Sequence, residues 1–207
     1  MLSCFAHTRS KLVASDHLRV RFGAITREFG VVDPLQGEVG DLFDQTFACA
    51  NSDAQYRSNR LQPGALPIEW SFSETELDAL RFEFQPFDPT LAGEERRRRT
   101  VGVVARIVEG YHNSDLAERF KLAVQSVSAE EPTLNFGAFV GLVQRPRCKY
   151  EFKIYVECDP KDPMLSTREL SNIAGAAPHF VSVSVGASAV SQRIYYICRD
   201  GLRAMDL

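Results

Sequence analysis

Six charged and aromatic residues in extended segments have side chains that could do chemistry: Glu69, Arg81, Lys153, Tyr155, Arg193 and Tyr195. Three cations on one surface suit an anionic ligand, and arginine offers paired N–H donors to phosphate-type oxygens. Tyrosine hydroxyls donate to the same oxygens, while the ring faces stabilise a nearby cation. A carboxylate such as Glu69 can accept a proton or orient a second substrate. The alternative is that these are ordinary exposed strand residues that form cross-strand Lys–Glu pairs.

Strict alternation of polar and apolar residues places these six side chains on three β-hairpins, over residues 67–87, 133–159 and 179–200. The clearest strand has Glu151, Lys153 and Tyr155 on one side and Phe152 and Ile154 on the other. A period of two predicts strands with one buried and one polar face. The chemistry-bearing residues therefore share the polar face.

Helical periodicity precedes each hairpin. It predicts helices over residues 16–30 and 37–50, a helix pair over 94–127 with a break near 110–114, and a short helix over 165–175. The resulting order is a repeated ααββ unit, which indicates an α+β fold. If the sheet curls into an antiparallel β-barrel with the helices outside, the polar face lines the interior.

Composition narrows the function classes. A chain of 207 residues with a formal net charge of −3 suits one globular domain and argues against a general nucleic-acid binder. No apolar run approaches a membrane span of roughly 20 residues. The N-terminus lacks the order of a signal peptide, which predicts a cytoplasmic protein.

Other motifs predict no metal site. The five cysteines have no CxxC pair, and the four histidines have no metal-ligand spacing. We therefore expect neither a zinc site nor a disulfide framework. The run Arg96–Arg99 is typical of the solvated start of a helix, with binding of nucleic acid or an acidic leader as the alternative.

The hairpins resemble those of the aromatic prenyltransferases with an ααββ barrel, both the fungal indole type and the cyanobactin peptide type. IEWSFSETELDALRFEFQPF is similar to their first hairpin, which has an acceptor-binding Glu and a diphosphate-binding Arg, matching Glu69 and Arg81. FKIYVECDP resembles their Lys-x-Tyr strand and matches Lys153 and Tyr155. The resemblance covers residues 18–200.

The third hairpin, FVSVSVGASAVSQRIYYICRD, resembles the next hairpin of the family. Its return strand reads Arg193-Ile194-Tyr195 where the fungal enzymes have Lys-x-Tyr, so the charge is kept. Ser191 stands where the fungal type has a further Arg, which removes one phosphate contact.

The resemblance implies transfer of an isoprenyl group from its diphosphate to an aromatic small molecule or a peptide side chain. The expected isoprenyl group is dimethylallyl. The three cations would bind the diphosphate, the two tyrosines would shield the carbocation, and Glu69 would hold the acceptor or take its proton. The chain has no DDxxD motif. No metal or other cofactor is therefore expected to be required, with magnesium at most stimulatory. The expected partners are the isoprenyl diphosphate and the acceptor, with no nucleic acid and no membrane.

The number of hairpins departs from the family pattern, because the family barrel uses five and this sequence predicts three. We therefore expect a single prenyltransferase-barrel domain over residues 1–207 that is incomplete at its C-terminus. Two explanations stay open, a shortened member or a chain that completes its barrel by self-association. A non-catalytic remnant that binds a peptide or polyanion is the alternative function.

Overall fold

The computed structural model describes residues 14–28, 36–47, 59, 61, 68–73, 76–87, 90–127, 136–145, 150–158, 177–198 and 201–206. The helix predicted over residues 165–175 and the last two residues of the helix predicted over 16–30 lie outside these residues.

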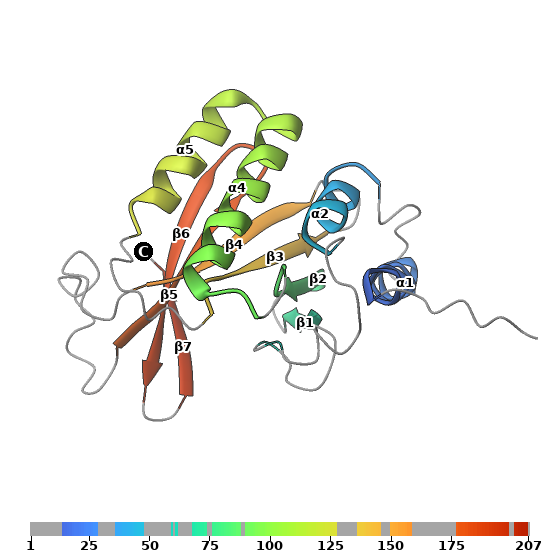
Figure 1. Cartoon of the computed structure of the whole chain (residues 1–207), viewed down its shortest axis with the longest axis horizontal. Helices are drawn as coiled ribbons and strands as arrows, with labels where there is room; N and C mark the ends of the chain where they lie inside the picture. The colour runs from blue at the N-terminus through green and yellow to red at the C-terminus, as the bar shows by residue number, and fades with distance from the viewer. Residues whose placement is uncertain are drawn as a thin grey trace, which may run out of the picture.

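Seven antiparallel strands form one sheet in which each strand pairs with the next along the chain (Figure 1). The strands are β1 (Ile68–Ser73), β2 (Glu76–Phe84), β3 (Ala138–Gln144), β4 (Glu151–Glu157), β5 (Ala177–Val185), β6 (Val190–Cys198) and β7 (Gly201–Asp206). The three predicted hairpins are confirmed as β1–β2, β3–β4 and β5–β6. Strand β7 was not predicted, because GLRAMD has no β-branched residue and only its pairing with β6 defines it.

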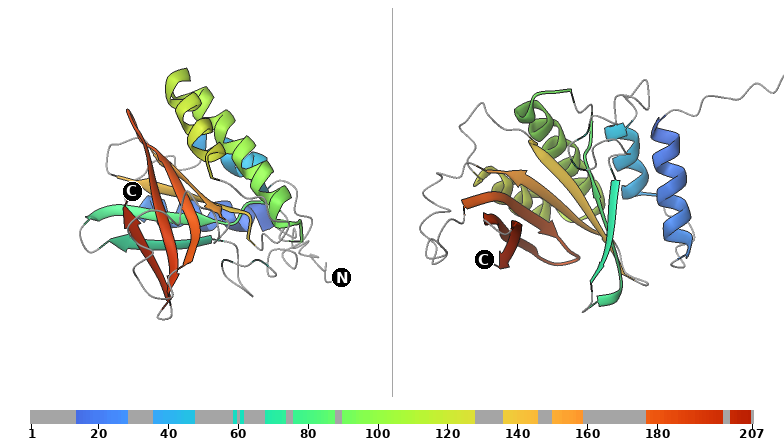
Figure 2. Two further views of the ribbon diagram at one scale, coloured as in Figure 1. Left: turned by 90° about the vertical axis from the view of Figure 1, so that its left-hand side faces the viewer. Right: turned by 90° about the horizontal axis from the view of Figure 1, so that it is seen from below.

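Helices α1 (Ala14–Glu28), α2 (Glu38–Phe47), α4 (Gly93–Tyr111) and α5 (Ser114–Gln125) lie on one side of the sheet (Figure 2). The predicted helix pair is confirmed, and its break falls at the start of α5. Here the Asn113 side chain accepts a hydrogen bond from the backbone N–H of Leu116 at 2.8 Å. Such a cap satisfies one of the N–H groups that a helix start leaves unpaired.

The hydrophobic core lies between the helices and the apolar face of the sheet. Phe82, Phe152 and Ile154 are at most 1% exposed. The Phe22 ring of α1 packs on Phe82 with 4.5 Å between ring centroids, and Phe43 of α2 packs on Phe22. Burial of one such side chain contributes about 1.5–3 kcal/mol. The apolar positions of the strand pattern therefore hold the helices on the sheet.

Helix α4 starts against the beginning of β3 through a very close backbone approach. Gly137 has φ +80°, and a Cβ built there would lie 2.1 Å from the carbonyl oxygen of Gly93. The Glu157 carboxylate accepts from the backbone N–H groups of Phe136 and Gly137 at 2.7 and 2.8 Å. Glu157 is only 5% exposed, so this carboxylate of β4 has a structural role.

The arginine run is not uniformly solvated. Arg96 is 2% exposed and donates to the carbonyl oxygens of Phe136 and Leu91, so the expectation of a solvated run is wrong for this residue. The neighbouring Arg97 donates to the carbonyl oxygen of Val127. Arg98 and Arg99 are exposed, because each residue of a helix is rotated by about 100° from the one before it and the run therefore covers more than one side of α4.

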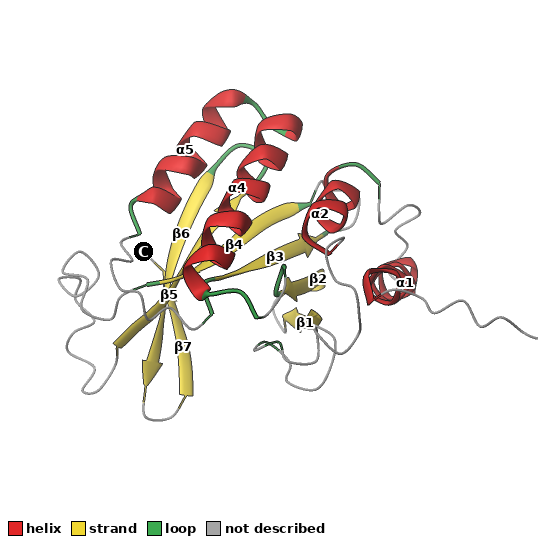
Figure 3. Cartoon of the chain, viewed as in Figure 1, coloured by secondary structure: helices red, strands yellow, loops and turns green. Residues whose placement is uncertain are grey.

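The secondary structure forms two layers, with helices covering one face of an antiparallel sheet (Figure 3). The sheet curves so that the helices lie on its outer side and the opposite face lies inside the curve (Figure 2). The predicted α+β architecture is therefore confirmed.

Candidate functional site

The inner side of the curved sheet is its polar face, defined here by Glu69, Arg81, Glu83, Lys153, Tyr155, Arg193 and Tyr195. Residues directly opposite each other on antiparallel strands point to the same side. Glu69 pairs with Glu83, Glu83 with Gly141, and Gly141 with Lys153. One row of side chains thus runs from β1 to β4, and Arg81, two residues before Glu83, lies on the same face.

A second row continues the polar face from β4 to β6. Tyr155 pairs with Ser182, and Ser182 pairs with Arg193. Tyr195, two residues after Arg193, lies on the same side. The structure therefore places all six predicted residues on one face.

The three cations are spread across this face, with Lys153 in the middle. Arg81 lies two strands away in one direction and Arg193 two strands away in the other. Strand spacing and rise put each arginine Cα about 12 Å from that of Lys153 on a flat sheet. Curvature toward the polar face shortens the approach of their side chains.

The two tyrosines are in direct contact. Their ring centroids lie 5.4 Å apart with an interplanar angle of 64°, and the Lys153 Nζ lies 5.7 Å from the Tyr155 ring centroid. The Tyr155 hydroxyl is hydrogen-bonded to Glu83 and to Tyr195. Burial raises the pKa of Tyr155, and the negative charge of Glu83 raises it further. Both effects favour the neutral phenol.

Glu83 and Gly141 belong to the site, but the sequence interpretation assigned them no role. Burial raises the pKa of the Glu83 carboxyl, and the charge of Glu69 raises it further. The hydrogen bond from Tyr155 and the charge of Lys153 act in the opposite direction. The alternation that selected Arg81 also puts Glu83 on the polar face, so this signal was available in the sequence.

Aromatic residues close one end of the polar face beside the tyrosines. Phe139 pairs with Tyr155 across β3 and β4, and Phe180 pairs with Tyr195 across β5 and β6. The Phe139 and Phe180 rings lie 5.6 Å apart. Both are less than 9% exposed. They form an apolar boundary on the strands next to the two tyrosines.

His179 lies at the same end of the sheet. Its ring meets Phe136 edge-on, with 5.6 Å between centroids and an interplanar angle of 88°. Burial lowers the pKa of His179, against a smaller opposite effect of Glu157. The ring is therefore favoured in its neutral form, as an aromatic packing partner.

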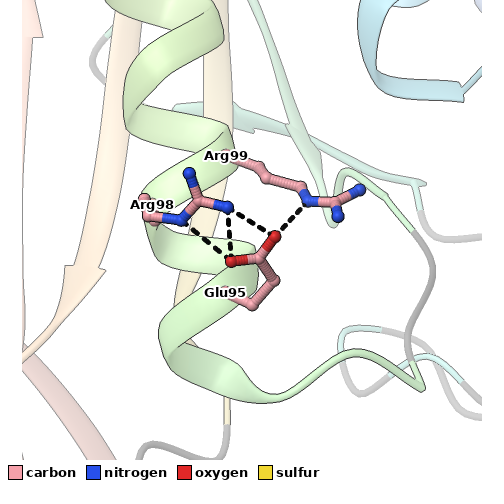
Figure 4. Close-up of polar contacts among 3 residues, drawn as sticks. All are labelled: Glu95, Arg98 and Arg99. Carbon is pink, nitrogen blue, oxygen red and sulfur yellow. Dashed lines mark hydrogen bonds and ion pairs between the residues drawn. The ribbon is translucent and has the colours of Figure 1, made fainter.

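The exposed arginines of the run on α4 are on the helical side of the sheet, away from the polar face. Figure 4 shows Arg98 and Arg99 bound to the Glu95 carboxylate. The Arg98 Nε and Arg99 Nε lie 2.9 and 2.6 Å from its oxygens. These two cations share one carboxylate partner on their own helix, which fits the expected solvated helix start.

In the part of the chain that the structure describes, no group of three or more His, Cys, Asp or Glu residues is arranged to hold a metal ion. The search of the same residues found no helix long and apolar enough to cross a membrane. Cys158 is a buried free thiol.

No protein-family model and no curated protein sequence matches the chain. Its structure is similar to that of 5-dimethylallyltryptophan synthase from Streptomyces coelicolor, with a TM-score of 0.64, 13% sequence identity and coverage of 88% of this chain and 58% of that one. It is also similar to the apo form of prenyltransferase PriB, with a TM-score of 0.63, 14% identity and coverage of 89% and 58%.

The chain spans less than two thirds of the length of either structure. At such low identity the similarity concerns the fold, and it agrees with the resemblance of the hairpins. The chain therefore has the ααββ-type fold of the aromatic prenyltransferases.

Proposed function

We propose that the chain is a prenyltransferase that moves an isoprenyl group, dimethylallyl in the first instance, from its diphosphate to an aromatic small molecule or peptide side chain. The observation that supports this most directly is the cluster of Lys153, Tyr155 and Tyr195 on the polar face of a prenyltransferase-type sheet. A cation for the leaving group thus lies next to aromatic rings for the developing carbocation.

In the proposed reaction, Arg81, Lys153 and Arg193 bind the diphosphate through its oxygens. Their positive charge favours cleavage of the bond between the allylic carbon and the diphosphate oxygen, because it offsets the charge that develops on the leaving group. The diphosphate departs with the bonding electrons and leaves an allyl cation. No metal or other cofactor is required in this scheme, and magnesium would be at most stimulatory.

The tyrosine rings are proposed to stabilise the cation and keep water away from it. The π face of an aromatic ring attracts a nearby positive charge. The apolar boundary of Phe139 and Phe180 excludes water that would otherwise capture the cation. The acceptor's nucleophilic atom then forms the new bond to the allylic carbon, and Glu69 takes the proton that the acceptor releases.

A product assay tests this proposal. The purified chain is mixed with dimethylallyl diphosphate and a panel of indoles, tyrosine derivatives and cyclic peptides, with and without magnesium. We expect an acceptor that gains the mass of one isoprenyl unit, and loss of that product in Lys153→Ala. Lys121→Ala is the matched control, because Lys121 pairs with Glu109 on α4 and lies on the helical side.

Binding of the diphosphate without any product would favour the alternative, a non-catalytic module that binds a polyanion or peptide. Absence of both binding and product would contradict the proposed function. Self-association through the edges of the sheet and a cytoplasmic location stay predictions, and light scattering of the same sample tests the first.

A further inference from the structure

Glu83 lies on the polar face in the row between Glu69 and Lys153, yet the proposed chemistry gives it no role. It is half-buried near the end of β2, opposite Glu69 on β1 and Gly141 on β3. A second carboxylate among cations that bind a diphosphate weakens their positive potential. A position that is unfavourable for anion binding calls for a different explanation.

Gly141 explains the position of Glu83, because a glycine has no side chain and leaves a gap in the polar face between β2 and β4. These strands flank β3 and lie about 10 Å apart, too far for most side chains to meet. A Cβ at Gly141 would lie 3.1 Å from Cε2 of Tyr155 and 3.3 Å from Cβ of Lys153. The Tyr155 ring therefore occupies the space above Gly141 and reaches Glu83 across β3.

The hydrogen bond between Glu83 and Tyr155 has a defined direction. A carboxylate only accepts, so the single hydroxyl proton of Tyr155 is donated to Glu83. The Tyr155 hydroxyl is also hydrogen-bonded to Tyr195. Glu83 thus fixes the first member of a chain that includes both rings.

We propose that Glu83 is a positioning residue, which holds the Tyr155 hydroxyl through the gap at Gly141 and thereby fixes both tyrosine rings beside Lys153. Its effect on turnover rests on the proposed function, but the Glu83–Tyr155 contact does not. Rings held in one orientation need no reorganisation when the cation forms, which is the benefit of a preorganised site.

Titration of Glu83 tests the contact without any activity assay. The groups facing Glu83 are Glu69 on β1, Arg81 on β2, Lys153 and Tyr155 on β4, and, through Tyr155, Tyr195 on β6. Carboxyl carbon NMR of glutamate-labelled protein follows the titration, and Glu83→Gln assigns the signal. The Tyr155 hydrogen bond lowers the pKa of Glu83. Tyr155→Phe is therefore expected to raise this pKa.

Gly141→Ala is expected to raise the pKa of Glu83 in the same way, because the added methyl group displaces the Tyr155 ring. Tyr150→Phe is the control, because Tyr150 packs against the hydrophobic core and leaves the Glu83 signal unchanged. An unchanged Glu83 pKa in both Tyr155→Phe and Gly141→Ala would overturn the proposal.

Kinetics test the positioning role. Glu83→Gln keeps an acceptor oxygen for Tyr155 and is expected to retain turnover within about threefold. Glu83→Ala loses the acceptor, and a fall of about tenfold in kcat is expected, with little change in KM for the diphosphate. Glu109→Ala is the control, because Glu109 lies on α4 on the helical side of the sheet, where Lys121 donates to it at 3.2 Å. Equal losses in the Gln and Ala variants would contradict positioning by the hydrogen bond.

The titration of Glu83 and the activity measurements distinguish the Glu83 proposal from the proposed function. A wild-type chain without product or diphosphate binding, but with the expected Glu83 titration in each variant, overturns the proposed function and supports the contact. A wild-type enzyme with normal product and no titration response overturns the Glu83 proposal alone.

Discussion

The two faces of the sheet come from alternate residues of the same strands, but they follow different rules. On β4, Phe152 and Ile154 are fully buried under the helices, whereas Lys153 and Tyr155 are half-buried on the polar face. The apolar face is held by close packing, which stabilises the fold. The polar face contains cations, a carboxylate pair and two tyrosines. Glu83 and Tyr155 on this face lose part of their hydration on folding, which is unfavourable. The residues that stabilise the fold and those of the proposed site are thus separated by one position along a strand.

Neighbouring substitutions on β4 test that separation with the largest expected effect. Phe152→Ala is expected to lower the free energy of unfolding by about 3–5 kcal/mol, because it leaves a cavity under the helices. Lys153→Ala is expected to change it by less than about 1 kcal/mol. Urea denaturation followed by circular dichroism measures both. Similar costs at the two positions would contradict the division of roles between the faces.

The contact between α4 and β3 tests the helix-covered side more locally. Gly137→Ala is expected to destabilise the protein by about 2 kcal/mol or more, from a positive φ and a clash with the Gly93 carbonyl group. Gly110→Ala is the control, because a Cβ at that helical position meets nothing within 4 Å. Thermal unfolding of the two variants provides the measurement, and equal melting temperatures would show that the close approach is unimportant.

These contrasts also show which features the sequence could predict. Alternation places Phe152 and Lys153 on opposite faces without any structure, since the period of a strand is two. Strand β7 escaped prediction because its residues have little intrinsic strand preference and pairing with β6 defines it. The burial of Arg96 could not be predicted from the arginine run itself, because it depends on a hydrogen bond to the Phe136 carbonyl group, 40 residues away.

Some residues of the site could be predicted from the sequence, but the contacts between them could not. The polar positions Lys153 and Tyr155 followed from the strand pattern, and the resemblance supplied their proposed roles. The contact of Glu83 with Tyr155 could not be predicted, because it depends on the register of three strands and on the missing side chain of Gly141. Spacing along one strand contains no information about register between strands.

The smallest expected effect is on how stability depends on pH, which differs between a carboxylate on the polar face and one on the helical side. The pKa of Glu83 is raised in the folded state, chiefly by burial. Stability from this group is therefore present below the ordinary glutamate pKa of 4.5 in the unfolded chain, and it is lost as the pH rises through the folded value. Glu83→Gln is expected to gain stability relative to wild type as the pH rises from about 4 to about 8.

Glu95 on α4 provides the control of opposite sign, since hydrogen bonds from Arg98 and Arg99 lower its pKa (Figure 4). Its contribution is present above the unfolded pKa and is lost as the pH falls through the folded value. Glu95→Gln is expected to lose stability relative to wild type over the same rise in pH. Urea denaturation at several pH values measures both, and slopes of the same sign would contradict the assignment.

The most direct test of the central claim is whether the polar face binds a diphosphate. Isothermal titration of dimethylallyl diphosphate into wild type, Lys153→Ala and Lys121→Ala measures the affinity. We expect Lys153→Ala to weaken binding by about tenfold or more, as the loss of a charge-assisted contact does, and Lys121→Ala to leave it unchanged. Equal affinity of wild type and Lys153→Ala would contradict the claim that the polar face is the ligand site.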